Sequence, residues 1–197
     1  KNYLIVSQRW DLDVREDLTA TRNLAQDLQQ KIRKHGVRHP RGGSDIFIFP
    51  RNCYRDMPDL VIGRAGWHNW MIYHARVRKW PVVDASNAMT IIHQSHDYGH
   101  LPGGKPHYRH PETEENIRLG GGKLTIFTLD DSQFLVKDGR LQRWQFSWKK
   151  VKREMEVFPL VVLRSRWIGM VFYALFHPLR AYSEGRAWLR KTRRIKL

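Results

Sequence analysis

Seven of the ten histidines fall within residues 63–110, a stretch that also holds closely spaced Trp, Asn and Asp side chains. A hydrophobic core does not require so many polar and aromatic groups in one short segment. Imidazole can ligate a transition metal or transfer a proton near neutral pH. The stretch therefore predicts a functional site, and its separate motifs indicate different kinds of chemistry.

One motif is His93-x-x-His96-Asp97, which directly follows an apolar run. Two imidazoles at this spacing can bind one transition metal, with Asp97 as a further ligand or as the group that orients a ligand. The spacing differs from the His-Glu-x-x-His of metalloproteases. A zinc hydrolase, a manganese site and a hydrogen-bonded loop all fit the pattern, and we predict a metal or phosphate role for His93, His96 and Asp97.

A second motif is Gly-Arg-Ala-Gly-Trp-His-Asn-Trp, which covers residues 63–70 at the start of an expected helix. Backbone N–H groups at a helix N-terminus can receive an anion or a sugar hydroxyl. Arg64 would add positive charge there, and Trp67 or Trp70 could stack on a sugar ring or a base. The alternative is a tight turn in which at least one of these tryptophans fills the core.

Carboxylates follow two of the expected strands. Asp84 ends the strand 81–83, where α/β proteins gather their ligands, so it is a candidate catalytic residue with a capping role as the alternative. Asp11 and Asp13 follow the first strand and could hold a divalent cation through oxygen ligands. We expect the polar residues 7–13 to close that strand, and the alternative for Asp11 and Asp13 is a polar turn or a helix-start signal.

The elements that must position these side chains alternate along the chain. Apolar runs predict strands, four-residue spacing of Leu24, Leu28 and Ile32 predicts a helix, and glycine or proline ends several elements. Such alternation is typical of an α/β domain. The expected strands are 3–6, 45–49, 81–83 and 89–92, and the expected helices are 18–35, 67–78 and 112–119.

The net charge of +16 is concentrated at the C-terminal side, where residues 137–197 hold 16 Lys/Arg against 4 Asp/Glu. We therefore expect one domain over residues 1–136 and a basic helical tail over 137–197. The tail's apolar blocks reach about ten residues, short of the roughly 20 that span a bilayer. Basic residues interleaved with Trp188 and Leu189 instead fit a helix lying on an anionic membrane.

Nucleic-acid binding is less favoured, because the basic residues of the tail alternate with apolar blocks and match no recognised motif. The single cysteine, Cys53, excludes an internal disulfide and a thiolate zinc cluster. A reducing compartment fits that composition. We expect a cytoplasmic protein, or one peripheral to the inner face of a membrane. Because Lys1 leads directly into an apolar strand, we also expect this chain to be part of a longer one.

Several sequence segments resemble a bacterial, often cyanobacterial, family of glycosyltransferase-like proteins with the nucleotide-diphospho-sugar transferase (GT-A) fold. The segments lie within about residues 3–125, and they are SQRWDLD, SDIFIFPR, IGRAGWHNWMIYHAR, VVDAS, IIHQSHDYGHLPGG and PETEENIRLGGG. The resemblance implies an α/β fold, the C-terminal part of a GT-A-like mixed sheet with flanking helices. It also implies transfer of a sugar from a nucleotide-sugar donor to a hydroxyl acceptor.

In that family a divalent cation, Mn or Mg, would neutralise the leaving diphosphate, with His93 or His96 as ligand. His68 or Asp84 would act near the acceptor. The sugar pocket would be shaped by Arg64, Trp67, Asn69 and Trp70. Members of the family usually have Asp at the position of His68, and a histidine there can also act as a base. Because His68 replaces the usual Asp, a second hypothesis is a non-catalytic or degenerate transferase that serves as a membrane-associated binding module.

Overall fold

The computed structural model describes residues 1–18, 22–95 and 110–195 of the chain. They form two compact units, Lys1–Gln145 and Phe146–Leu197. Unit 1 has mixed sheets with flanking helices, which confirms the α/β class predicted from the sequence. The units divide later than the expected boundary between residues 136 and 137, which falls inside a strand. The excess of basic residues begins before the division between the units, because the last strand pair of unit 1 is already basic.

The larger sheet has five strands in the order β4-β1-β5-β7-β8. The central three are parallel, and the outer two are antiparallel to their neighbours. Leu4, Val6 and Val82 are fully buried in its centre, where apolar residues on both faces favour parallel strands. The strands are β1 (Leu4–Ser7), β4 (Ile46–Ile48), β5 (Val82–Asp84), β7 (Phe134–Lys137) and β8 (Arg140–Arg143). Asp138 and Gly139 join the last two with positive φ angles of 52° and 70°, as a tight hairpin turn requires.

The smaller sheet has three strands in the order β3-β2-β6, namely β3 (Val37–Arg38), β2 (Arg9–Leu12) and β6 (Ile91–Gln94). β2 runs parallel to β6 and antiparallel to β3. The expectation that the polar residues 7–13 close the first strand with a turn or a helix start is wrong over Arg9–Leu12, because these residues form a strand. Its residues alternate between the two faces of the sheet, and Leu12 is buried while Asp11 is only half-buried.

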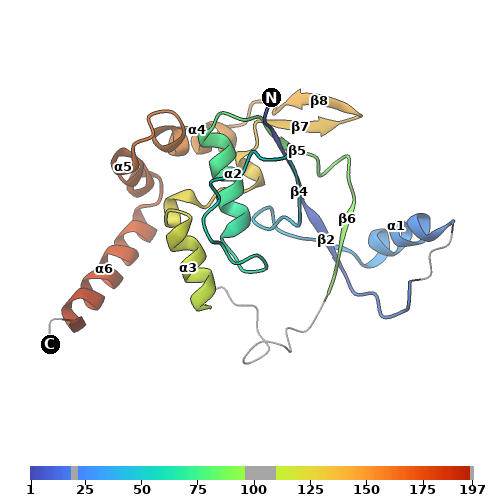
Figure 1. Ribbon diagram of the computed structural model, residues 1–197, viewed down its shortest axis with the longest axis horizontal. Coiled ribbons are helices and arrows are strands. Elements are labelled where there is room, and N and C mark those ends of the chain that lie inside the picture. The colour runs from blue at the N-terminus through green and yellow to red at the C-terminus, as the bar shows by residue number, and fades with distance from the viewer. Residues whose placement is uncertain (19–21, 96–109, 196–197) are drawn as a thin grey trace. The chain divides into compact units, whose positions relative to one another are not determined.

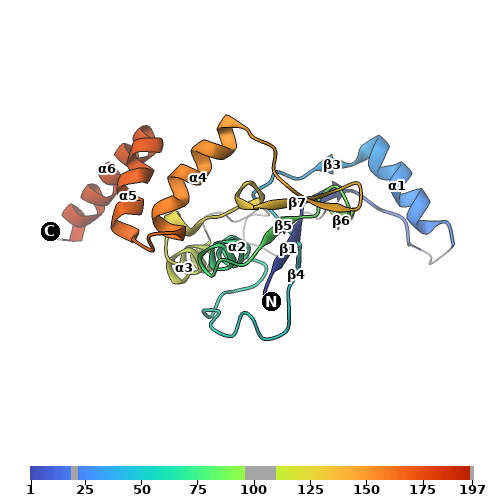
Figure 2. The same ribbon diagram turned by 90° about the horizontal axis from the view of Figure 1, so that it is seen from above.

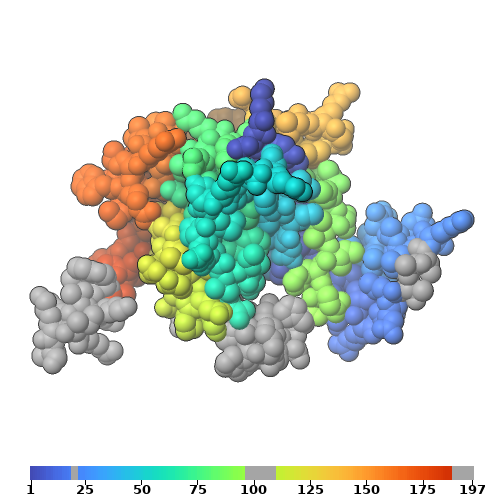
Figure 3. Space-filling view, viewed as in Figure 1, coloured from blue at the N-terminus to red at the C-terminus, as the bar shows by residue number. Residues whose placement is uncertain are grey.

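The described part of unit 1 also has the helices α1 (Leu24–His35), α2 (Trp67–Val77) and α3 (Pro111–Leu119), together with short 3-10 turns at Lys123–Thr125 and Leu129–Asp131. α1 lies beside β2, and α2 lies beside β5 (Figure 1). In the space-filling view, α3 lies directly against the chain that leads into α2 (Figure 3). Asn116 of α3 is fully buried there and hydrogen-bonds to Val61 and to Ala65. This contact fixes the start of α2.

Unit 2 consists of α4 (Trp148–Val161), α5 (Arg166–Phe176) and α6 (Pro178–Ile195). Ser147 caps α4 and Ser165 caps α5, each hydroxyl accepting a hydrogen bond from a first-turn backbone N–H. α5 lies between α4 and α6 (Figure 2). Within the described ranges, we find no helix whose length and apolarity would carry it through a membrane.

Candidate functional site

The loop of residues 39–45, between β3 and β4, is the point at which three of the predicted site residues meet the same segment. Each contact joins the loop to a different element, the start of α2, the end of β5 or the end of β6. The predicted residues in contact with the loop are His68, Asp84 and His93. Residues far apart in the sequence are thus gathered around one connection.

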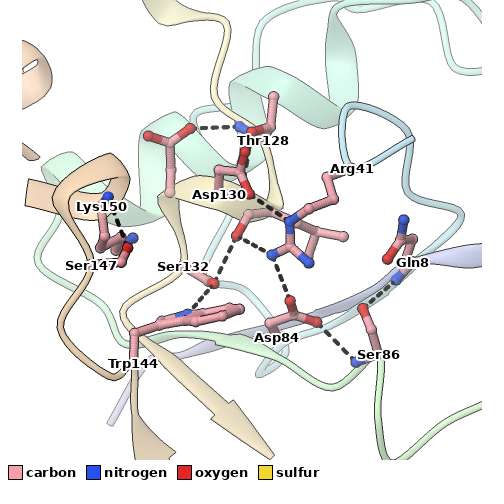
Figure 4. Close-up of polar contacts among 12 residues, drawn as sticks. Gln8, Arg41, Asp84, Ser86, Thr128, Asp130, Ser132, Trp144, Ser147 and Lys150 are labelled. Carbon is pink, nitrogen blue, oxygen red and sulfur yellow. Dashed lines mark hydrogen bonds and ion pairs between the residues drawn. The ribbon is translucent and has the colours of Figure 1, made fainter. Parts of the chain in front are cut away.

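Arg41 is the central cation of the loop (Figure 4). Its Nη2 lies 2.7 Å from Oδ2 of Asp84, and its Nε lies 2.5 Å from Oδ1 of Asp130. Nη2 also donates a hydrogen bond to the Leu129 carbonyl, and the guanidinium carbon lies 5.3 Å from the centre of the Trp144 ring. The side chain of Asp84 is only 4% exposed, so Arg41 supplies the positive charge that a buried carboxylate needs.

Asp84 uses both carboxylate oxygens inside the protein. Oδ2 receives Arg41, and Oδ1 accepts a hydrogen bond from the Ser86 backbone N–H at 2.9 Å. The Ser86 hydroxyl in turn accepts a hydrogen bond from the backbone N–H of Gln8 (Figure 4). This geometry fits the capping alternative, in which Asp84 positions Arg41 and the turn after β5. A catalytic role for Asp84 stays a prediction.

A second charged cluster surrounds Arg9 of β2. Arg9 lies 2.9 Å from Asp11 and 2.7 Å from Asp45. His39 lies 2.7 Å from Asp11, and His93 lies 2.7 Å from Asp45. Burial opposes ionisation of Asp11, but the hydrogen bond from His39 and the charges of Arg9 and His39 outweigh it, so the pKa of Asp11 is lowered. Asp11 is therefore a carboxylate over the whole neutral range.

The expected metal site involves His93, His96 and Asp97. His93 contacts Asp45, whereas His96 and Asp97 lie outside the described residues. Among the residues that the structure describes, no group of three His, Cys, Asp or Glu side chains is arranged to hold a metal ion. Since Asp45 is paired with Arg9, the described side chains do not fit a divalent cation. The Mn or Mg site stays a prediction.

His68 lies in the first turn of α2 and is half-buried. Its Nε2 lies 3.0 Å from the carbonyl oxygen of Gly42. A carbonyl can only accept, so Nε2 carries the proton and the neutral ring keeps its lone pair on Nδ1. Burial lowers the pKa of His68, as do the positive charges of Arg9 and His39, although the Gly42 carbonyl and Asp45 oppose them. His68 is therefore neutral at pH 7 and able to accept a proton at Nδ1.

The other predicted residues of the 63–70 motif divide into two groups. Asn69 and Trp70 are buried: Asn69 donates a hydrogen bond to the Phe127 carbonyl, and the Trp70 ring lies 4.6 Å from that of His74. The alternative that a tryptophan fills the core is thus confirmed for Trp70. Arg64 and Trp67 are half-buried, with Arg64 paired to Glu112 and the Trp67 ring 5.0 Å from that of Phe47.

The sequence motifs did not indicate four side chains that hold these clusters together: Arg9, His39, Arg41 and Asp45. Three of them lie in the segment His-Pro-Arg-Gly-Gly-Ser-Asp, residues 39–45. Its signal was the density of charged side chains around two glycines, directly before a strand. Comparison of the chain with protein-family models, with curated proteins and with solved structures found no match.

Proposed function

We propose that the 39–45 loop and its partners form part of a glycosyltransferase site, which transfers a sugar from a nucleotide-sugar donor to a hydroxyl acceptor. The observation that carries the proposal is the pairing of a neutral His68 with the loop that also holds Arg41. A base and a cation therefore meet at consecutive positions of the loop, since Gly42, which contacts His68, directly follows Arg41. The sequence segments that resemble glycosyltransferases supply the proposed reaction class, and they also suggest the GT-A fold.

His68 is the proposed general base. As the acceptor oxygen attacks the anomeric carbon, its proton passes to Nδ1 of His68, and the bond between that carbon and the diphosphate oxygen breaks. The nucleoside diphosphate leaves with the electron pair. The lowered pKa keeps His68 in the form that can take the proton at neutral pH. Positioned bases of this kind typically contribute about 10²–10⁴-fold in rate.

Arg41 is the proposed cation for the leaving diphosphate. Guanidinium groups bind phosphate oxygens in a fixed geometry, and such charge stabilisation is commonly a large part of catalysis. Arg41 uses Nε and Nη2 for Asp130, Asp84 and Leu129. Its Nη1 is the nitrogen assigned to the donor. Asp84 holds the guanidinium in place, and no step is assigned to a metal ion.

Calorimetric titration of the full chain with UDP-sugars and GDP-sugars, each with and without Mn, tests donor binding. The expected result is saturable binding of at least one nucleotide sugar. A titration in which Mn strengthens that binding would support the predicted cation site. A folded full-length protein that binds none of the nucleotide sugars would refute the proposal.

Three variants test the base. His68→Gln keeps an N–H for the Gly42 carbonyl but removes the base, so release of nucleoside diphosphate should fall about 10²–10⁴-fold. His68→Asp, the residue usual in the resembling family, should retain turnover, with the acidic limb of its pH profile moved to lower pH. His35→Gln, an exposed histidine at the end of α1, is the matched control. Equal rates for wild type and His68→Gln would exclude His68 as the base.

A second candidate function is a non-catalytic binding module. The specific observation in its favour is that Asp84, which contacts the loop, and Asp45, which ends it, are both held by arginines. Such a module would bind a nucleotide sugar without releasing nucleoside diphosphate in the presence of acceptor alcohols. The same titration followed by a product assay therefore separates the two functions.

A further inference from the structure

Unit 2 exposes an unusual amount of apolar surface. Among the side chains whose exposure the structure describes, twelve large apolar ones are exposed to solvent in unit 2 and ten in the longer unit 1, so exposure is concentrated in unit 2. Large apolar side chains gathered at the surface of neighbouring helices mark an interaction site in a water-exposed protein. The twelve are Phe146, Trp148, Met155, Phe158, Val162, Leu163, Trp167, Met170, Val171, Leu175, Leu179 and Tyr182.

α5 supplies the clearest apolar face. Trp167, Met170, Val171 and Leu175 recur at spacings of three and four, so they share one side of the helix. Trp167 is 71% exposed and Leu175 is 70% exposed. The other side of α5 packs on α4, where a Cβ on the buried Gly169 would lie 2.8 Å from the Leu160 side chain. The exposed face is therefore not the one that holds the unit together.

A second face has the same character. On α4 and at its C-terminal cap, Trp148, Met155, Phe158 and Val162 follow one another at spacings of seven, three and four residues, which again places them on one side. Trp148 is 78% exposed. Consecutive helices of unit 2 thus each present apolar side chains to solvent.

The same unit is strongly basic, with 13 Lys/Arg against 3 Asp/Glu in residues 146–197. Its three acidic side chains are turned to partners within the unit: Glu154 to Lys150, Glu156 to Arg153 and to His177, and Glu184 to Tyr173. The charge that unit 2 offers to its surroundings is therefore positive. A partner must accept both large apolar side chains and a high positive charge.

We infer that unit 2 is a membrane-docking module, whose apolar faces enter the interface of an anionic lipid bilayer while its Lys and Arg side chains contact the headgroups. α5 has 11 residues and a length of about 16 Å, about half of a bilayer core, which suits a helix lying in the interface. A second copy of the chain would bring two units of net charge +10 together. A nucleic acid would match the charge but leave the apolar side chains in water.

Vesicle flotation of the full chain tests the inference directly, without nucleotide sugar, so that its failure is distinct from failure of the proposed transferase. The expected result is binding to phosphatidylcholine/phosphatidylglycerol vesicles at least about tenfold tighter than to phosphatidylcholine alone, since each basic residue near an anionic surface contributes about 1 kcal/mol. High salt should weaken the binding. Equal affinity for both vesicles, or none for either, would overturn the inference.

Trp167→Glu and Leu175→Glu test the apolar face. Each should weaken vesicle binding by about tenfold or more, because a buried side chain of this size contributes roughly 1.5–3 kcal/mol. Leu141→Glu makes the same change at a 60% exposed position of unit 1 and should leave binding unchanged. Circular dichroism checks that each variant is folded. The protein could instead bind no vesicles and form a concentration-dependent dimer that both unit 2 variants abolish. That result would assign the apolar face to contact with a second copy of the chain.

Discussion

Replacing Arg41 by Met should destabilise unit 1 more than any other loss of a single charge around the loop. The substitution removes the ion pair with Asp84, whose side chain is 4% exposed, and the hydrogen bond to the Leu129 carbonyl. It also removes a pair with the 36%-exposed Asp130, which is expected to contribute at most about 1 kcal/mol. Breaking a buried ion pair from one side costs about 3–5 kcal/mol.

That range is an upper bound here, because Arg41 is 28% exposed and the Ser86 backbone N–H still serves Asp84 in the variant. We expect a loss of about 2–4 kcal/mol in the free energy of unfolding. With an m-value of about 2 kcal/mol/M, the urea midpoint followed by circular dichroism would fall by about 1–2 M. Arg15→Met is the matched control, since its pair with Asp13 is exposed and should contribute about 0.5 kcal/mol or less.

The double variant Arg41→Met/Asp84→Asn separates charge from packing. If the cost comes from an unpaired buried carboxylate, neutralising Asp84 in the Arg41→Met background should recover at least about 1 kcal/mol. Strict additivity of the two single changes would refute the reasoning, as would an Arg41→Met midpoint equal to that of the wild type.

Three further predictions concern other parts of unit 1. Burial lowers the pKa of both His68 and His74 below the ordinary 6.5, so the unfolded chain binds more protons than the folded protein just below that pH. The urea midpoint of unfolding should therefore rise with pH up to about 6.5–7 and fall on acidification. A midpoint that does not change over this pH range would contradict the lowered pKa values. Gly66→Ala should lower the free energy of unfolding by about 1–3 kcal/mol, because Gly66 has a φ of 106° and an added Cβ would lie 3.0 Å from the Asn116 Cβ. In the same urea titration, Gly63→Ala should lower it less, since Gly63 has a φ of 89° but open space around it. Asn116→Ala should lower the free energy of unfolding by about 2–4 kcal/mol, since it removes three hydrogen bonds at a fully buried position. A thermal midpoint of the variant within about one degree of the wild type would contradict this prediction.

Most of the elements around the site could be predicted from the sequence. Short apolar runs indicated β1, β4, β5 and β6, and helical spacing indicated α1, α2 and α3, because each element buries a face that its own residues define. β2 was missed because the alternation Arg-Trp-Asp-Leu, although typical of a half-buried strand, covers only four residues within a polar segment. β8 was missed because it is exposed along its whole length and shows no apolar run.

The site was less accessible to sequence reasoning. Histidine density drew attention to His68 and His93, and strand-end placement drew attention to Asp84. Their partners on the 39–45 loop depend on how the sheets assemble. Arg41 meets Asp130 across 89 positions of the chain, and no local spacing encodes such a contact. The basic and apolar character of unit 2, in contrast, could be predicted from the sequence of the tail. This character depends on composition and not on contacts between residues far apart in the chain.

The 39–45 loop has a consequence for how the chain can vary in evolution. Its contacts follow in strict succession, with His39 on Asp11, Arg41 on Asp84, the Gly42 carbonyl on His68 and Asp45 on Arg9. A substitution at one position breaks one contact, whereas loss or gain of a single residue would displace all of those that follow it. Relatives of this chain should therefore differ here by exchanges of side chain and keep the number of residues between β3 and β4 constant.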